Sequence, residues 1–442
     1  MSSFYYQDLY STPEMREAFS DEARIQAWID TELALVKAQV TLGIVPAGVD
    51  VLMEESFQFS RLDLKEMKTD YDKIGFPILP FVKQLSKLCD KETARWIHYG
   101  ATTQDILDTG TALQMKKALG IVERDLNAII KTLAAIVEKH KDTVMAGRTF
   151  QQLAAPITFG FKAAVWLDEL LRHRTRLNEL RGRVLVGQCS GAVGTFATLG
   201  DQGLEVQRQM MSYLGLGVPS ISWHTARDSW SELIHLFAMV GATLAKIANE
   251  ISMLMRSEIA ELSEPIGGGR GASSTMPQKR NPILCEPIQA IAPKLRELSG
   301  SQLTAMIQEH ERGVWHMTLE WLVIPEAFLL LSASLHHTFE VLDGLIVNEQ
   351  AMRSNLEING GTIMAEAAMM GLASKIGKAA AHDVITEISG RVYRNQSSLR
   401  DELFKDVEIS KLLTSQEIED LMNPLNYIGS ARAMIKQVLE KV

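Results

Sequence analysis

Residues 229–254 have the sequence SWSELIHLFAMVGATLAKIANEISML, in which apolar residues recur at alternating spacings of four and three. This spacing gives a helix one side that is apolar from end to end. At about 1.5 Å per residue the segment makes a helix of about 39 Å, which is longer than a small core can cover. It therefore predicts one helix of a long bundle, and Ser229 and Glu232 match a capping box at its start. The apolar positions are Leu233, Phe237, Val240, Leu244, Ile247, Ile251 and Leu254.

Helix is expected to dominate the rest of the chain as well. Only 13 of 442 residues are proline, and long tracts contain mainly Ala, Leu, Met, Glu, Lys and Gln, which lose little conformational entropy on entering a helix. We expect an all-α protein in three parts. A helical cap occupies residues 1–108, the central bundle residues 109–350, and a second helical cap residues 351–442.

The composition narrows the possible partners and compartment. The hydrophobic share of 46% is that of a globular protein, and the net charge of −9 comes without Lys/Arg clusters, which argues against nucleic acid as a partner. Three distant cysteines show no metal-ligand or disulfide spacing. The N-terminus lacks a signal peptide, and charges are expected to interrupt every apolar stretch before it could span a membrane. We therefore expect a soluble cytoplasmic protein without a metal ion.

Residues 264–282, with the sequence EPIGGGRGASSTMPQKRNP, are the most unusual stretch. Four glycines in five positions between two predicted helices favour a mobile lid loop. A plain linker is the alternative, but it would not need serines, a lysine and an asparagine beside two prolines. A phosphate-binding P-loop is excluded because no Gly-Lys-Ser/Thr ends the run.

The second half of this loop resembles the signature Gly-Ser-Ser-x-Met-Pro-x-Lys-x-Asn of the fumarase/aspartase superfamily, with Ala272 in place of the first glycine. The resemblance implies that Ser273 is the base that removes a proton beside a carboxylate. A serine hydroxyl needs a neighbouring field to act in this way, and Lys279 and Asn281 are placed to supply it. Ser274 and Met276 are assigned to the substrate site by the same signature.

Residues 98–105, HYGATTQD, resemble the superfamily turn His-x-Gly-x-Thr-Ser-x-Asp, which holds a carboxylate. The resemblance assigns this role to Thr102, Thr103 and Gln104. An ordinary helix N-cap is the alternative explanation of the same residues.

Residues 147–156, GRTFQQLAAP, are similar to the family element Thr-His-x-Gln-x-Ala-x-Pro. Thr149 and Gln152 match its polar positions and are assigned to substrate binding. Phe150 takes the place of a histidine that helps to protonate the leaving group in adenylosuccinate lyases, and Leu153 departs from the pattern too.

Residues 308–320, QEHERGVWHMTLE, resemble an element in which an arginine binds the substrate. We expect Arg312 to bind a carboxylate through two hydrogen bonds, with a surface ion pair as the alternative. Residues 223–228, WHTARD, resemble a segment of 3-carboxy-cis,cis-muconate cycloisomerases, in which His224 could serve as the catalytic acid. His98, His310 and His316 compete for this task, and a structural role is the alternative for His224.

These elements follow the superfamily order over nearly the whole chain. The resemblance implies a homotetramer with a 20-helix core, active sites built from three subunits, and no organic cofactor or metal. Phe150, the neighbours of Tyr10 and the Lys68 to Asp72 segment depart from adenylosuccinate lyases, so the cycloisomerase branch is the nearest relative. The first hypothesis is thus a lyase or cycloisomerase acting on a di- or tricarboxylate. The alternatives are a fumarate-releasing C–N lyase on an N-substituted aspartate and a non-catalytic helical scaffold.

Overall fold

The structure is a computed structural model that describes residues 4–267, 271–272 and 275–442. This part of the chain contains twenty α-helices and two sheets of two strands each, which confirms the all-α prediction. The four subunits and their 20-helix core stay a prediction.

Five long helices, which hold most of the predicted central region, pass through both compact units into which the chain divides. They are α8 (Thr103–Lys139), α9 (Phe159–Val184), α11 (Asp228–Leu254), α12 (Cys285–Ala305) and α13 (His316–Asp343). The first unit consists of Met1–Asp125, Arg174–Ala242 and Ala290–His336, and the second of Leu126–His173, Thr243–Gln289 and His337–Val442. The three-part division made from the sequence stays a prediction.

Helix α11 confirms the periodicity from which it was predicted. All seven apolar residues of the alternating pattern are buried. The predicted capping box is wrong, because the helix begins one residue earlier, at Asp228, and Ser229 lies inside it. The side chain of Glu232 instead accepts a hydrogen bond of 2.8 Å from Nε of Arg183.

Two helices are long and strongly apolar. By length and composition α11 and α13 could each cross a membrane, although charged residues such as Lys246 and Glu326 occur within them. In both helices 61% of the most apolar stretch is buried inside the protein. Burial of this kind is typical of core helices.

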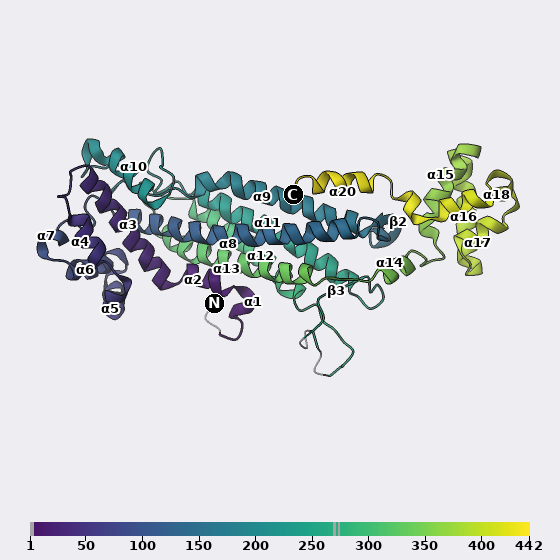
Figure 1. Ribbon diagram of the computed structural model, residues 1–442, viewed down its shortest axis with the longest axis horizontal. Coiled ribbons are helices and arrows are strands. Elements are labelled where there is room, and N and C mark those ends of the chain that lie inside the picture. Colours follow the sequence, from purple (N-terminus) through teal and green to yellow (C-terminus); the bar gives the residue numbers. More distant parts are fainter. Residues whose placement is uncertain (1–3, 268–270, 273–274) are drawn as a thin grey trace. The chain divides into compact units, whose positions relative to one another are not determined.

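The first unit also contains the short helices of the N-terminal region and α10. Helix α3 packs lengthwise against α10 (Figure 1), and their contact is filled by small and flexible apolar side chains such as Ala34, Ala38 and Met210. The helices are α1 (Gln7–Tyr10), α2 (Pro13–Ala18), α3 (Asp21–Thr41), α4 (Val49–Ser56), α5 (Leu64–Ile74), α6 (Ile78–Leu88), α7 (Lys91–Ala94) and α10 (Gly203–Leu214), with 3-10 turns η1 (Phe59–Arg61) and η2 (Gly200–Gln202).

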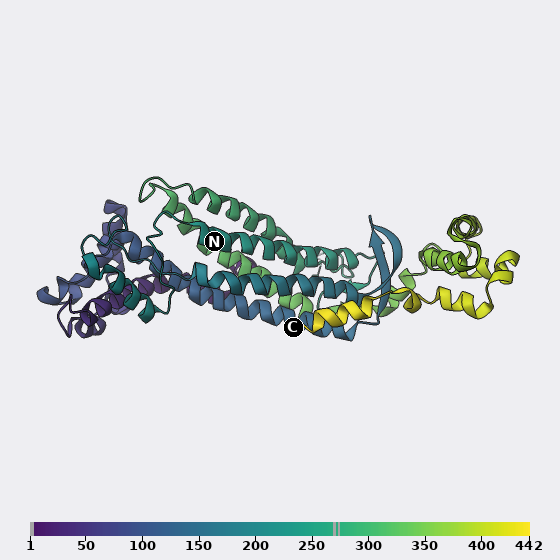
Figure 2. The same cartoon turned by 90° about the horizontal axis from the view of Figure 1, so that it is seen from above.

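The second unit contains a β-hairpin, a short sheet and a cluster of C-terminal helices. Strands β1 (Val144–Thr149) and β2 (Gln152–Thr158) form the hairpin, a long curved ribbon in Figure 2. Strands β3 (Leu262–Ser263) and β4 (Ile346–Val347) form the other sheet.

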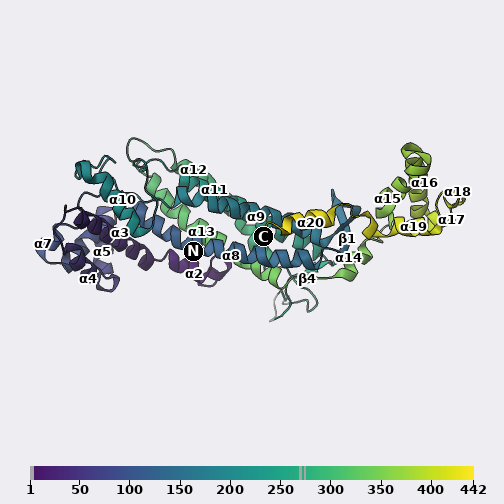
Figure 3. The ribbon, with the colours of Figure 1, turned by 45° about the horizontal axis from the view of Figure 1, so that its top comes forward.

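Helices α15 to α19 gather around one apolar core (Figure 3), which also includes Val144 and Ala146 of the hairpin. The elements of this region are α14 (Glu349–Asn355), η3 (Thr362–Met364), α15 (Ala365–Ile376), α16 (Lys378–Asn395), α17 (Leu399–Lys405), α18 (Val407–Leu412), α19 (Ser415–Met422), η4 (Pro424–Tyr427) and α20 (Ala431–Leu439).

Candidate active site

The turn that precedes α8 is held by Asp105, which is fully buried. Its carboxylate accepts hydrogen bonds from the backbone N–H of Thr102 at 3.0 Å, of Ser190 at 3.1 Å and of Gly191 at 2.9 Å. These bonds join the start of α8 to a loop almost ninety positions further along the chain. The turn is therefore rigid before any substrate arrives.

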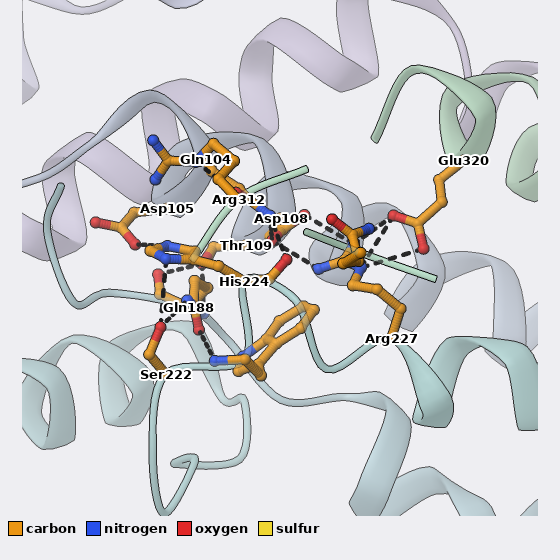
Figure 4. Close-up of polar contacts among 12 residues, drawn as sticks. Gln104, Asp105, Asp108, Thr109, Gln188, Ser222, His224, Arg227, Arg312 and Glu320 are labelled. Carbon is orange, nitrogen blue, oxygen red and sulfur yellow. Dashed lines mark hydrogen bonds and ion pairs between the residues drawn. The ribbon is translucent and has the colours of Figure 1, made fainter. Parts of the chain in front are cut away.

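Gln104 and Arg312, both assigned to substrate binding from the sequence, are in direct contact (Figure 4). The amide nitrogen of Gln104 donates to Asp108 at 3.1 Å and to the carbonyl of His224 at 2.9 Å. This fixes the orientation of the amide, so that its oxygen accepts a hydrogen bond of 2.8 Å from Nε of Arg312.

The guanidinium of Arg312 also donates through Nη2 to the carbonyl of Ala192, at 3.1 Å, and lies 3.5 Å from Oγ1 of Thr102. Its Nη1 has no partner among the residues that the structure describes. Thr103 is the first residue of α8, a long helix whose free backbone N–H groups favour an anion. The structure thus gathers Thr102, Thr103, Gln104 and Arg312 into an arrangement able to bind a carboxylate, and their role stays a prediction.

His224, assigned as a catalytic residue from the sequence, lies beside this arrangement but is only 2% exposed. Its Nε2 is 2.9 Å from Oδ1 of Asp105, and its Nδ1 is 3.3 Å from Oγ of Ser222. Because both ring nitrogens already have partners, the contacts are those of a residue that positions Asp105. The role of His224 as an acid stays a prediction.

Arg227 forms a buried charge cluster that the sequence analysis missed. Its guanidinium donates to Asp108 at 2.8 Å and to Glu320 at 2.6 Å, and the rings of Trp223 and Trp230 lie 4.7 and 4.2 Å from its central carbon. Burial alone would lower the pKa of Arg227, but the two carboxylates outweigh it and raise that pKa. The sequence signal that could have pointed to this cluster was the four-residue spacing of Gln104 and Asp108, which places both side chains on one face of a helix.

His98 is held by Glu32, a second residue that the sequence analysis missed. Oε1 of Glu32 is 2.7 Å from Nδ1 of His98, and Oε2 accepts the backbone N–H of His98 at 3.0 Å. Burial lowers the pKa of His98, but the charge and hydrogen bond of Glu32, assisted by Asp105, more than offset it and raise that pKa. A backbone φ of +60° marks His98 as strained. Glu32 thus fixes the ring of His98, and the catalytic role of His98 stays a prediction.

The hairpin of the second unit carries Thr149 and Gln152, which face each other at its turn. Phe150 and Gln151 form the turn with φ values of +48° and +64°, the conformation that a two-residue hairpin loop requires. Phe150 is 99% exposed. Arg148 anchors the strand through an ion pair of 2.7 Å with the buried Glu261.

The glycine-rich loop has its ends tied together. The buried carboxylate of Glu264 accepts the backbone N–H of Leu284 at 3.1 Å and of Cys285 at 2.8 Å, which closes the loop at the start of α12. Asn281 donates its backbone N–H to the carbonyl of Gly271 at 3.0 Å, and its side chain reaches the same oxygen at 3.3 Å.

The structure describes some of the other predicted residues of this loop but not all of them. Met276 and Lys279 are exposed. Ser273 and Ser274 lie outside the described residues. Among the described residues, no three His, Cys, Asp or Glu side chains are placed to hold a metal ion.

The chain is similar to known lyases over most of its length. Residues 9–296 match a family model described as lyase, and residues 361–438 match one described as adenylosuccinate lyase C-terminus. The chain is 39% identical over 430 residues to a 3-carboxy-cis,cis-muconate cycloisomerase of Pseudomonas aeruginosa, covering 96% of this chain and 93% of the relative. It is 37% identical over 430 residues to an N-acetyl-S-(2-succino)cysteine lyase of Dickeya dadantii, covering 97% and 94%. The crystal structure of a fumarate lyase from Mesorhizobium sp. BNC1 is 40% identical, with a TM-score of 0.91 over 98% of both chains.

Proposed function

The chain belongs to the lyase family of the fumarase/aspartase superfamily, and we propose that it catalyses elimination, or the reverse addition, beside a carboxylate. Ser273 removes a proton from the carbon next to the carboxylate, and a C–O or C–N bond at the neighbouring carbon breaks. The electron pair of that bond leaves with the oxygen or nitrogen, and a double bond forms between the two carbons. No oxidant or reductant is needed.

One observation carries the proposal, namely the contact of Arg312 with Gln104 at the start of α8. Loss of the proton drives negative charge onto the substrate carboxylate, so donors must be in place where that charge develops. Gln104 and the carbonyl of Ala192 fix two sides of the guanidinium. Its remaining edge can then bind a carboxylate without first reorganising.

Two forms of this reaction have support. In a cycloisomerase the leaving oxygen belongs to a carboxylate of the same molecule, and the exposed aromatic Phe150 in place of a histidine favours that branch. In a fumarate-releasing lyase the leaving group departs as a separate molecule, and the relative from Dickeya dadantii carries a succino group in the name of its substrate. Adenylosuccinate is disfavoured as the substrate because Phe150 cannot protonate a leaving group.

We also propose a cytoplasmic homotetramer whose active sites combine residues of three subunits, without a metal or organic cofactor. Apolar side chains that stay exposed on the long helices support association. They include Val165 on α9, Met239 on α11, Leu303 on α12 and Leu322 on α13. Exposed apolar side chains of this kind are common where subunits meet.

The proposal is tested by ultraviolet absorbance of fumarate and of carboxymuconate. Wild-type protein and the Ser273→Ala variant are incubated with N-substituted aspartates, adenylosuccinate and 3-carboxy-cis,cis-muconate. We expect one class to react, with the rate falling about 10²- to 10⁴-fold in Ser273→Ala and unchanged in the control Ser410→Ala, an exposed helical serine. Equal rates in wild type and Ser273→Ala would refute the base assignment, and silence across the panel would favour the non-catalytic scaffold.

A further inference from the structure

A cavity of about 400 Å³ lies in the first unit, between residues of α3, α5, α8, α11 and α13. Trp28, Trp230 and Trp321 line it together with Met67 and Met317. Cavities of this size that are lined by aromatic and flexible apolar side chains commonly bind small molecules. None of these five residues belongs to the predicted catalytic or substrate-binding set.

The acidic residues that line the cavity already have partners. Asp108 and Glu320 are paired with Arg227, at 2.8 and 2.6 Å, and Asp21 pairs with Arg24 at 2.9 Å. Their charges are therefore balanced within the protein.

The remaining charged residue at the cavity is Lys68, which pairs with Asp72 one helical turn further along α5. A phosphate or carboxylate entering the cavity would have to displace Asp72 or Asp21 from its cation. An uncharged apolar group would bind without breaking any of these pairs, and it would gain from leaving water.

The cavity adjoins the predicted carboxylate site through two consecutive hydrogen bonds. Asp108, in its wall, accepts from the side chain of Gln104 at 3.1 Å, and Gln104 accepts from Arg312 at 2.8 Å. Met317 lies on α13, five positions after Arg312. Five residues of fully extended chain span at most about 18 Å, so the cavity wall at Met317 lies within that distance of Arg312.

From this arrangement we propose that the cavity binds the leaving group and that the substrate is a succinate bearing an apolar amine or thiol substituent. The inference rests on the proposed elimination and on Arg312 as the carboxylate ligand, and it selects the fumarate-releasing form. The C–N or C–S bond breaks with its electron pair going to the heteroatom, which gains a proton. The carbon skeleton leaves as fumarate.

The test uses three substrates that differ only in their substituent, N-methyl-, N-butyl- and N-benzyl-aspartate. Their Kd values are measured by calorimetry on the full-length Ser273→Ala variant, which binds without turnover. Full burial of each added methylene corresponds to a factor of about four, so the Kd should fall from methyl to butyl and again to benzyl. Equal Kd values for all three compounds would overturn the cavity assignment.

A matched pair of substitutions at Met67 tests whether the substituent binds in the cavity. Met67 is only partly buried at the edge of an apolar core, and Met67→Leu controls for any loss of packing there. Combined with Ser273→Ala, Met67→Glu should bring the Kd ratio of the methyl to the benzyl compound close to one, whereas Met67→Leu should preserve it. A ratio that survives Met67→Glu would place the substituent elsewhere and overturn the assignment.

Turnover by the wild type separates this inference from the proposed function. Fumarate release from the three compounds, absent in Ser273→Ala, supports the elimination whatever the order of the Kd values. Graded binding without any fumarate contradicts the elimination itself. Fumarate release with ungraded binding contradicts the cavity assignment alone.

Discussion

Nε of Arg312 lies 2.8 Å from the side-chain oxygen of Gln104, although 208 positions of sequence separate the two residues. Because Gln104 donates to Asp108 and to the His224 carbonyl, its oxygen can only face Arg312. The contact therefore aims a cation at the N-terminus of α8 before substrate binds. This preorganisation is the property that an elimination beside a carboxylate requires.

The Arg312→Lys variant is expected to lose most of the carboxylate affinity. A lysine keeps the charge but cannot bond Gln104 and a carboxylate with one planar group. We expect kcat/KM to fall about 10- to 100-fold, as for loss of a charged hydrogen bond, mostly through KM. Arg296→Lys, at an exposed arginine of α12, is the control, and an unchanged KM for Arg312→Lys would argue against this role.

The pKa of His98 is expected to fall in the Glu32→Gln variant, because glutamine keeps an acceptor but removes the charge that raises it. A raised folded-state pKa means that protonated His98 stabilises the fold below about pH 6.5. This stabilisation disappears as the pH rises through the folded-state value. The gap in unfolding free energy between wild type and variant should therefore narrow above pH 6.5.

The measurement is NMR titration of the imidazole together with urea unfolding at several pH values. Glu22→Gln, an exposed residue of the same helix, serves as control. A gap that stays constant with pH would show that the contact does not depend on the charge of His98.

Removal of Arg227 is expected to destabilise the first unit strongly. Arg227→Met leaves Asp108 and Glu320 buried without a counter-charge, a change that costs about 3–5 kcal/mol. Replacing all three residues by apolar ones of similar size should restore much of the loss. Arg183→Met, which breaks an exposed pair with Glu232, should cost no more than about 1 kcal/mol in the same melts. A triple variant as unstable as Arg227→Met would contradict this explanation.

Phe150 is expected to matter for activity but not for stability. Its side chain is 99% exposed and its φ is +48°, a conformation that asparagine adopts more readily. Phe150→Asn should therefore keep the unfolding free energy within about 0.5 kcal/mol while lowering kcat/KM. Gln151→Asn, its neighbour in the same turn, should keep full activity. Equal activity of both variants would show that Phe150 has no role in the active site.

Glu264 is expected to hold the two ends of the glycine-rich loop together. Glu264→Ala removes the acceptor for Leu284 and Cys285 at the start of α12, which should cost about 1–2 kcal/mol, as for a lost helix cap. Limited proteolysis should then cut within residues 265–283 faster than in wild type. Glu258→Ala, at an exposed glutamate, should show the wild-type pattern, and no faster cleavage in Glu264→Ala would rule out a closing role.

The helices and the order of the motifs could be predicted from the sequence because both are local properties. The apolar spacing in α11 needs only the regular geometry of one helix, and all seven positions are buried as it requires. The capping box predicted at Ser229 was wrong because the start of a helix is not decided by local sequence alone. Which residue begins a helix depends on what the preceding segment packs against, and here Arg227 is anchored by distant carboxylates.

The motif residues themselves, from Thr102 to Arg312, were visible in the sequence, but their partners were not. In the sequence Glu32 is one of several acidic residues in its helix, and only the fold places it against His98. Asp108, Arg227 and Glu320 come from three helices or their edges, and only packing makes them one cluster. A hydrogen bond acts over about 3 Å, so the partner of a polar group is decided by which distant segment the tertiary structure brings within that reach.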